Sequence, residues 1–339
     1  KKNIVLVWDD NKETRNKIKN GYPDIHLSNP KDTNWENVSF VLVSPGITLE
    51  HSLLQFPRKL NIPLYRDLEI YSRLLTSQKV IAITGTNGKS TTTKLIGDII
   101  RSNNHNCFVG GNIGRPLIDF KNVKDKSNYH VIELSSFQLE SAPSFHSYIS
   151  IILNISHDHL DRYDSIDQYV NQKKKILNKN KGKYNIISVD DDYCKEIYNS
   201  LENVNNIPIS ISRKIQKGVY FLDGAIHDNY FFDNKIISLN NISQSLYGNF
   251  NKQNILAAYV VSHILQMNVK NLLKVVGDFV GLPHRLEKII ENNKLVIINN
   301  SKATNLDSTL KSISNYNNIY LIIGGRVKED NFSSIANYK

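Results

Sequence analysis

The stretch from Ile83 to Thr91 reads I-T-G-T-N-G-K-S-T and contains residue types that bind phosphate. A run of apolar residues precedes it, and a segment with helical periodicity follows it. At a strand-to-helix turn of this kind, backbone N–H groups and the helix dipole can hold phosphate oxygens. Lys89 would then neutralise the β and γ phosphates of a nucleotide, and Ser90 would bind Mg²⁺. A glycine-rich turn with a chance lysine is the alternative, but the flanking strand and helix favour a phosphate loop.

The glycine spacing departs from the most common phosphate loop. The pattern G-x-x-x-x-G-K-[ST] needs a glycine five positions before Gly88, but that position holds Ile83 and the other glycine is Gly85. The sequence therefore predicts a compact variant of the loop, which narrows the families to which it can belong.

Two further strands are predicted to end in groups that can bind metal ions. Glu133 lies at the end of the predicted strand 129–134, and Asp158 and His159 follow the predicted strand 148–154. A carboxylate at a strand end can hold a Mg²⁺ ion that bridges nucleotide and substrate oxygens, and His159 could be a ligand that Asp158 orients. Glu133 could equally be a helix-capping or surface acid, and a lone histidine is more often structural. Because ligands of open α/β sheets bind beyond the carboxyl ends of the strands, these ends could share one site with the phosphate loop.

The elements that must position these groups alternate between short β-branched runs and longer helical segments, which is typical of βαβ units. The predicted fold class is therefore α/β with parallel sheets. The predicted strands are 3–8, 40–43, 79–83, 129–134, 148–154, 294–299 and 319–323, with further short strands in 207–239 that turn at Asp223-Gly224 and Asp233-Asn234. The predicted helices are 11–20, 89–102, about 251–265 and near 305–314.

This alternation begins three times along the chain, which predicts three domains, 1–77, 78–281 and 282–339. The first domain opens directly on a strand, and the third holds only one strand-helix-strand crossover. We therefore expect both end domains to be incomplete.

The composition excludes several classes of protein. With 339 residues, of which 40% are apolar, the chain can bury large cores, so disorder is not expected. Its two cysteines, Cys107 and Cys194, lie far apart and without partners at metal-ligand spacing, which fits a reducing compartment. The apolar runs are much shorter than the roughly 20 residues that span a bilayer, and no secretory signal opens the chain. We expect a cytoplasmic protein without membrane insertion.

The net charge of +10 would suit either a nucleic acid or an anionic small substrate. The lysines are mixed with asparagine and isoleucine throughout, as a compositional bias would produce, and such runs are usually solvated faces. The sequence has no basic stripe interleaved with aromatic residues, of the kind that single-strand binders use. We therefore expect no nucleic-acid partner, and we expect a monomer.

The segment T-G-T-N-G-K-S-T resembles the phosphate loop of the Mur ligases and the related folylpolyglutamate synthases. The octapeptide Glu133 to Glu140, E-L-S-S-F-Q-L-E, is similar to the signature of the Mur ligases that add D-glutamate, and Asn154 to Tyr163 resembles the Mur pattern N-x-x-x-D-H-L-D-R-Y. On these motifs the chain is identified as a member of the Mur ligase family. Membership implies a Rossmann-like N-terminal domain, a central P-loop ATPase-type domain with a parallel sheet, and a Rossmann-like C-terminal domain.

The resemblance implies an ATP-dependent ligation in peptidoglycan precursor synthesis. ATP would phosphorylate the terminal carboxylate of UDP-N-acetylmuramoyl-L-alanine, and the amine of D-glutamate would attack the acyl phosphate and release phosphate. The implied cofactors are ATP and two Mg²⁺ ions. One alternative is another Mur-type ligase or a folylpolyglutamate synthase that takes a different amino acid. The other is a nucleotide- or nucleic-acid-binding module without ligase activity.

The resemblance also implies the metal-binding and catalytic groups. They would be Lys89, Ser90, Glu133, His159 and Lys173. Lys173 ends a segment that matches the one in which the family carries a carbamylated lysine. A carbamate is an anionic oxygen ligand, whereas an ammonium would be repelled by Mg²⁺. Because Lys173 opens a lysine triplet, a register shift by one residue is the alternative.

Further binding residues follow from the same resemblance. The ATP site would contain Gly85, Thr86, Asn87, Gly88, Lys89, Ser90, Thr91, Asn251, Asn254, His284, Arg285 and Asn300. The UDP-substrate site would contain Asp9, Asp10, Ser44, Pro45, Gly46, Asn112 and Ser135, although plain strand-end turns are the alternative at 9–10 and 44–46. The amino-acid site would contain Lys302, Thr304 and Lys328. The chain differs from the family pattern at Phe250, Asn300, Arg326 and Val327, where the family has histidine, aspartate, an acidic residue and a small residue.

Overall fold

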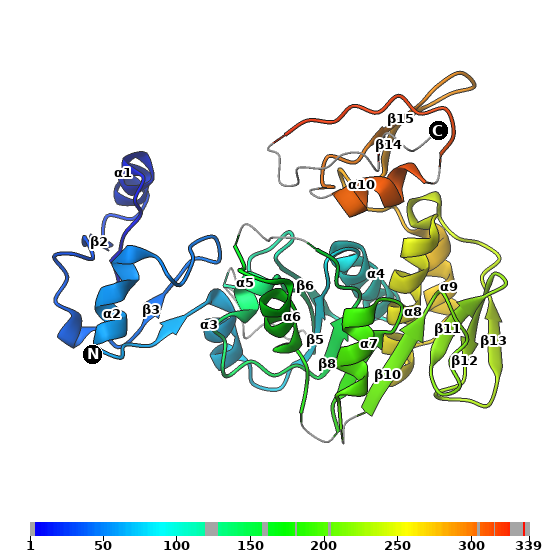
Figure 1. Ribbon diagram of the computed structural model, residues 1–339, viewed down its shortest axis with the longest axis horizontal. Helices are drawn as coiled ribbons and strands as arrows, with labels where there is room; N and C mark the ends of the chain where they lie inside the picture. Colours follow the sequence, from blue (N-terminus) through cyan, green and yellow to red (C-terminus); the bar gives the residue numbers. More distant parts are fainter. Residues whose placement is uncertain are drawn as a thin grey trace.

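The computed structural model describes residues 4–118, 128–157, 162–179, 182–202, 205–303, 306–314, 316–325 and 335. Its largest element is a nine-stranded sheet with the strand order β13-β12-β11-β10-β9-β8-β5-β7-β6 (Figure 1). The pairs from β6 to β11 are parallel, and β12 and β13 extend the sheet with antiparallel pairs. The predicted α/β class with a parallel sheet is therefore confirmed.

The strands of this sheet agree with the sequence prediction where the chain is most apolar. They are β5 (Lys79–Thr84), β6 (Cys107–Gly111), β7 (Tyr129–Glu133), β8 (Ile149–Ile152), β9 (Tyr184–Ser188), β10 (Asn205–Ser210), β11 (Val219–Leu222), β12 (Ala225–Asp228) and β13 (Lys235–Ser238). The predicted turn at Asp223-Gly224 joins β11 to β12. Both of its residues have positive φ, 49° and 76°, as a two-residue hairpin turn requires.

Helices cover both faces of the sheet (Figure 1). In β5, Ile81 and Ile83 pack with α4, α8 and α9, whereas Val80 and Ala82 pack with α3, α6 and α7 on the opposite face. A strand that is apolar on both faces is typical of a buried parallel sheet. The helices of this part are α3 (Asp67–Leu74), α4 (Lys89–Ser102), α5 (Ser136–Leu139), α6 (Ile166–Lys174), α7 (Asp192–Asn199), α8 (Asn249–Ile264) and α9 (Val269–Asp278), with a short 3-10 helix at Gln244–Leu246.

Residues 4–65 contain two small parallel strand pairs. The pairs are β1 (Leu6–Val7) with β2 (His26–Leu27) and β3 (Val41–Leu42) with β4 (Leu64–Tyr65). The predicted helix 11–20 is confirmed as α1 (Lys12–Gly21), which begins there because Asn11 accepts hydrogen bonds from the N–H groups of Glu13 and Thr14. The remaining elements are α2 (Gln55–Lys59) and 3-10 helices at Trp35–Asn37 and Ser52–Leu54.

The C-terminal part differs from the prediction in its strands. An antiparallel pair, β14 (Glu287–Glu291) with β15 (Val296–Asn299), is followed by α10 (Leu306–Ile313). The predicted strand 294–299 and helix 305–314 are therefore confirmed, and β14 was missed. The predicted strand 319–323 is wrong, because these residues form no ladder with any described strand and Tyr320 is 98% exposed. An apolar run becomes a strand only when a neighbour pairs with its backbone.

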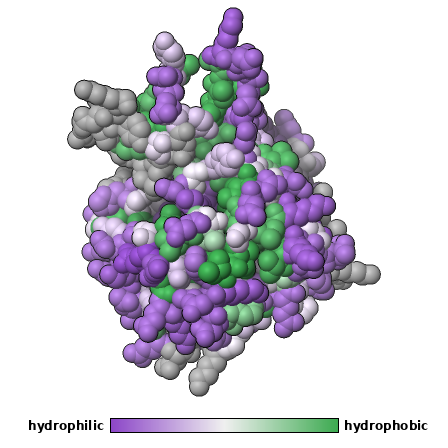
Figure 2. All heavy atoms as spheres, turned by 90° about the vertical axis from the view of Figure 1, so that its right-hand side faces the viewer, coloured by the Kyte–Doolittle hydropathy of each residue, from purple (hydrophilic) through white to green (hydrophobic). Residues whose placement is uncertain are grey.

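The face at the right of Figure 1 carries hydrophobic side chains at its centre and hydrophilic side chains around them (Figure 2). The antiparallel edge formed by β11 to β13 lies on this side of the molecule (Figure 1). Among the described residues, none of the helices is both long and apolar enough to cross a membrane.

Candidate active site

The phosphate loop lies between β5 and α4, at the edge where neighbouring parallel strands also end. In the register of the sheet, Ile83 pairs with Glu133 on β7 and with Ile151 on β8. Gly88, which precedes the first residue of α4, has a φ of 84°, and a Cβ atom there would lie 2.4 Å from Oδ1 of Asn254. A glycine is required at this position both for its backbone conformation and for the space. The strand ends that the sequence pattern predicted to be neighbours are neighbours.

Glu133 is the centre of a polar cluster at this edge. Its side chain is almost fully buried, with 2% exposure, and Ser90 donates a hydrogen bond of 2.6 Å to its Oε2 atom. Asn112 donates to Oε1 over 3.1 Å, and the Nη2 atom of Arg285 donates to Oγ of Ser90 over 2.7 Å. Burial lowers the pKa of the Arg285 guanidinium, and the nearby carboxylate of Glu133 acts in the opposite direction. A carboxylate, a hydroxyl and a guanidinium thus meet at the loop, a set that can handle both a cation and phosphate oxygens.

Asn112 reaches Glu133 because of the glycine before it. Gly111 pairs with Glu133 across β6 and β7 and has a φ of 109°. A Cβ atom at Gly111 would lie 2.3 Å from the carbonyl oxygen of Glu133, so the two backbones can approach this closely only at a glycine. The backbone N–H of Asn112 donates to the same carbonyl over 2.9 Å, which fixes the side chain beside the carboxylate.

Two lysines converge on the carbonyl of Gly85. Lys89 from the loop and Lys173 from α6 each donate to this oxygen over 2.8 Å, and Lys89 also donates to the carbonyl of Thr86. Lys173 is 2% exposed, and its Nζ atom lies 4.5 Å from the ring centroid of Tyr169. Lys175 in the same triplet is exposed. Of the three lysines, Lys173 is therefore the buried one at the loop.

A chain of amide side chains also supports the loop, and no role was predicted for it from the sequence. The side chain of Asn154 accepts from the backbone N–H of Asn87 over 2.8 Å and donates to the carbonyl of Asn87 over 3.1 Å. It also donates to Oε1 of Gln253, which in turn donates to Oγ of Ser188, each over 2.8 Å. An asparagine that follows an apolar strand could have suggested this contact, but nothing in the local pattern indicates Gln253.

Asn254 lies next to the phosphate loop at Gly88, and Asn251 lies beside Asn254. Asn254 accepts a hydrogen bond from Thr92 on α4 over 3.0 Å and donates to Oδ1 of Asn251 over 2.8 Å. Asn251 donates to the carbonyl of Tyr247 over 3.0 Å. In this structure the two buried amides join the start of α8 to α4.

The C-terminal residues of the predicted ATP site divide into two groups. Arg285 reaches the phosphate loop. His284 instead forms a 2.8 Å hydrogen bond with Asn299, and Asn300 accepts from the N–H of Leu286 over 3.2 Å. Lys302 is exposed and lies beside His284 through a backbone hydrogen bond. The other predicted residues His159, Thr304 and Lys328, with Asp158, Arg326 and Val327, lie outside the described residues.

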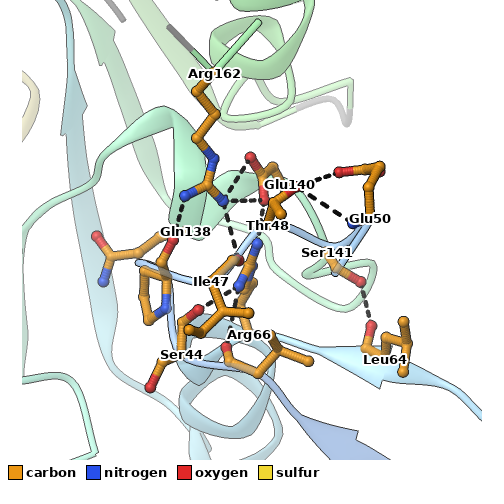
Figure 3. A network of polar contacts seen from close by, with 12 residues as sticks. Ser44, Ile47, Thr48, Glu50, Leu64, Arg66, Gln138, Glu140, Ser141 and Arg162 are labelled. Atoms are coloured by element: carbon orange, nitrogen blue, oxygen red, sulfur yellow. Dashed lines mark hydrogen bonds and ion pairs between the residues drawn. The ribbon is translucent and has the colours of Figure 1, made fainter. Parts of the chain in front are cut away.

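The predicted UDP-substrate residues other than Asn112 lie at positions 9–10, in the turn 44–46 and at the start of α5. Asp10 forms part of a cavity of about 310 Å³ lined by Trp8, Asp10, Asn29, Lys31, His51, Ser52 and Leu53. Asp9 accepts from the N–H of Asn11 over 2.8 Å, which is a strand-end turn. The turn 44–46 packs against the central part of the molecule through arginine side chains (Figure 3). Ser135 is the N-cap of α5 and forms a capping box with Gln138.

The phosphate loop, the buried carboxylate on the neighbouring strand and the arginine from a later segment together define a class of protein. A parallel sheet with a strand–loop–helix phosphate site and an acidic strand end is the arrangement of P-loop enzymes, which position a nucleotide for phosphoryl transfer.

Comparison with known proteins identifies the family within this class. Residues 83–262 match the model of the Mur ligase middle domain. The chain is 35% identical to the UDP-N-acetylmuramoylalanine--D-glutamate ligase of Rickettsia bellii over 98% of its own length and 74% of that protein. It is 34% identical to the protein of the same name from Phenylobacterium zucineum, over 96% of this chain and 71% of that one. The chain belongs to the Mur ligase family.

Solved structures agree with this fold. The chain resembles the UDP-N-acetylmuramate-alanine ligase MurC of Thermotoga maritima with a TM-score of 0.56 and 17% identity, over 91% of this chain and 70% of that one. It resembles MurF of Acinetobacter baumannii with a TM-score of 0.55 and 16% identity, over 84% of this chain and 71% of that one. At these identities the similarity bears on the fold alone.

Proposed function

We propose that this chain catalyses the ATP-dependent ligation of D-glutamate to UDP-N-acetylmuramoyl-L-alanine, a step of peptidoglycan precursor synthesis. The names of the relatives at 34–35% identity support this choice of substrates. The terminal carboxylate of the UDP substrate takes the γ-phosphoryl group of ATP. The amine of D-glutamate then attacks the resulting acyl phosphate, and inorganic phosphate leaves.

The phosphate loop binds the nucleotide in this scheme. Its backbone N–H groups and the N-terminus of α4 face the phosphates, and Lys89 moves from the carbonyls that it contacts to the β and γ phosphates. Arg285 brings a planar guanidinium with several donors to the same place. These cations offset the charge that develops on the phosphoryl oxygens, which is the main contribution of protein groups to phosphoryl transfer.

The site also fits Mg²⁺. The hydroxyl of Ser90 and the carboxylate of Glu133 are oxygen ligands, which Mg²⁺ prefers, and an ion held by few protein oxygens keeps positions for phosphate and water. Bound Mg²⁺ would polarise the phosphoryl oxygens. The described residues contain no group of three or more His, Cys, Asp or Glu side chains that could hold a metal ion. In our proposal, His159 and a carbamate on Lys173 complete the ligands of two ions. Burial of Lys173 beside the loop supports that role.

The remaining substrate contacts follow from position. Asn112, held against Glu133, would meet the reacting end of the muramoyl substrate. Ser135, two residues after Glu133 in the chain, would also contact this substrate. The cavity beside Asp10 and the turn 44–46 would bind the UDP end. Lys302, Thr304 and Lys328 would bind D-glutamate. The other proposed nucleotide contacts are Thr86, Asn87, Thr91, Asn251, Asn254, His284 and Asn300.

We also propose that the chain acts as a monomer in the cytoplasm without a nucleic-acid partner. Its proposed domains are 1–77, 78–281 and 282–339, and they correspond to UDP-substrate, ATP and amino-acid binding. The nine-stranded sheet lies within the second of these ranges.

The observation that carries the proposal is the contact of Ser90, Glu133, Arg285 and Asn112 at the mouth of the phosphate loop. The experiment measures phosphate release by the full-length protein with ATP, Mg²⁺ and UDP-N-acetylmuramoyl-L-alanine. Each assay also contains one amino acid, which is D-glutamate, L-lysine, L-alanine or meso-diaminopimelate. Release that depends on D-glutamate is expected. Release without an amino acid, or with every amine, would show that the assignment is wrong, and a preference for another amino acid would identify a sister ligase.

A further inference from the structure

A single carboxylate, that of Glu140, is shared by two arginines from different parts of the chain (Figure 3). Arg66 is the residue immediately before α3, and its side chain forms an ion pair with Oε2 of Glu140. Arg162 lies beyond β8 and donates to Oε2 over 3.1 Å and to Oε1 over 3.3 Å. The Arg66 side chain is 0% exposed, and those of Glu140 and Arg162 are 11% and 14% exposed. We call these three residues the Glu140 bridge.

Both arginines of the bridge also hold the backbone of the turn 43–47. Arg66 donates through Nη1 to the carbonyls of Val43 and Ser44. Arg162 donates to the carbonyl of Pro45 over 2.9 Å and to that of Ile47 over 3.2 Å. Figure 3 shows the two guanidinium groups between the turn and Glu140. Almost every carbonyl of this turn is therefore fixed by a charged donor.

Glu140 makes this arrangement possible. Two buried guanidinium groups close to each other repel, and carbonyl dipoles alone compensate a buried charge poorly. A carboxylate between them supplies the opposite charge, and each planar fork keeps further N–H groups for the carbonyls. Tyr163 adds a donor to Oε1 over 3.2 Å, and the guanidinium of Arg162 lies 3.9 Å from the ring centroid of Phe137.

The same octapeptide ties the bridge to the reacting centre. Glu133 at its first position contacts Ser90 of the phosphate loop, and Glu140 at its last position holds the bridge. Between them lies α5, whose capping box of Ser135 and Gln138 fixes the start of the helix. One short segment therefore connects the turn 43–47 with the phosphate loop.

We propose that Glu140 is a positioning residue, which through Arg66 and Arg162 holds the turn 43–47 in the geometry that binds the UDP end of the substrate. The inference rests on the proposed function, which assigns this turn to the UDP-substrate site. Glu140 itself does not touch the substrate or the reacting atoms. Its effect is on substrate binding and not on the chemical step.

The test compares Glu140→Gln with wild type in the full-length protein. Glutamine keeps the size of the side chain and removes its charge. The expected result is a KM for UDP-N-acetylmuramoyl-L-alanine about tenfold higher, equivalent to about 1.4 kcal/mol, with kcat and the KM for ATP within about twofold. Glu36→Gln is the matched control, because Glu36 is an exposed glutamate of the N-terminal part outside the polar network of Figure 3, and it should leave all three constants unchanged. A fall in kcat together with a rise in the KM for ATP would overturn the proposal. An unchanged KM for the UDP substrate would also overturn it.

A second measurement is independent of turnover. Hydrogen exchange of the Ile47 amide, which donates to the carbonyl of Ser44 over 3.0 Å, should be at least about tenfold faster in Glu140→Gln than in wild type. Exchange in β5 should not change. Equal exchange at Ile47 would overturn the proposal even if the protein proved not to be a D-glutamate ligase. Conversely, a wild-type protein without D-glutamate-dependent turnover would refute the proposed function alone.

Arg162→Lys covers the case in which Glu140→Gln fails to fold. Lysine keeps the charge beside Glu140, but its ammonium cannot reach Pro45, Ile47 and the carboxylate in the fork geometry of arginine. A rise in the KM for the UDP substrate relative to wild type, with kcat retained, supports the positioning role. An unchanged KM with folded protein contradicts it.

Discussion

Asn154 should control how well the phosphate loop binds ATP. Its side chain holds both the N–H and the carbonyl of Asn87 in the loop, over 2.8 and 3.1 Å. Asn154→Ala removes both contacts but keeps the backbone contact in which the carbonyl of Asn154 accepts from the N–H of Thr86 over 2.8 Å. The segment should therefore stay in place while the loop loses its side-chain support.

The size of the effect follows from these two hydrogen bonds. A typical hydrogen bond contributes about 0.5–1.5 kcal/mol net, so the pair is worth about 1–3 kcal/mol. Because the loop must be ordered to bind phosphates, we expect most of this loss to appear in the affinity for ATP. The expected weakening is roughly 5- to 150-fold. Gln253→Met leaves both contacts of Asn154 with the loop and removes the bonds of Gln253 to Asn154 and Ser188, so it should have a smaller effect of about threefold.

The assay is isothermal titration of ATP with Mg²⁺ into wild type and each variant, together with urea unfolding. Asn268→Ala is the matched control, because this asparagine caps α9 by accepting from the N–H of Lys270 over 2.9 Å. Its loss should cost about 1 kcal/mol of stability and leave the affinity for ATP unchanged. If Asn154→Ala binds ATP within twofold of wild type, the loop does not depend on this support and the reasoning is refuted.

Three further predictions use other parts of the structure. Lys89→Ala should lower the rate of phosphate release at least about 100-fold. Lys94→Ala on the same helix, which removes an ion pair with Asp98, should leave that rate within about twofold of wild type. Similar losses of rate in the two variants would contradict the phosphate-loop role of Lys89. Burial raises the pKa of the Asp67 carboxyl, so the folded state binds this proton more tightly than the unfolded state. The stability that this proton contributes is therefore lost as pH rises above the ordinary carboxyl pKa of about 4. Urea unfolding should therefore show that Asp67→Asn gains stability relative to wild type between about pH 4 and about pH 7, and a constant difference would contradict this sign. Burial raises the pKa of the Cys107 thiol to about 12 and that of Cys194 well above its ordinary value, so at about pH 8 a thiol reagent should react at least about tenfold more slowly with native than with unfolded protein.

The central strand, loop and helix could be predicted from sequence because the signals are local. The apolar run of β5, the glycines and the first residue of α4 follow one another without a gap, and the helix 89–102 has the predicted limits. The neighbouring ends of β7 and β8 follow from the rule that parallel strands end at the same edge. The order of the strands and the pairing of β5 with both neighbours came only from the structure.

The supports of the site could not be predicted, because they join residues that are distant in sequence. Arg66 and Glu140 are 74 positions apart, and Asn154 and Gln253 are 99 positions apart. Such polar contacts leave no periodic pattern, since each depends on the packing of several elements. The strand 319–323 failed for the converse reason: its apolar residues gave a local signal, but no described strand pairs with it.

The compact loop explains why a lysine from α6 can contact the backbone of the loop. Position 83, where the common pattern has a glycine, is a fully buried isoleucine inside β5, so the strand continues to Thr84 and the turn consists of only four residues, 85–88. The carbonyl of Gly85 therefore lies directly beyond the strand, where Lys89 and Lys173 both reach it although the latter is 88 positions away. A longer loop would carry this carbonyl away from the strand end and from α6. The short spacing and the buried lysine are thus two parts of one arrangement, and a variant that lengthens the loop should separate Lys173 from the carbonyl of Gly85.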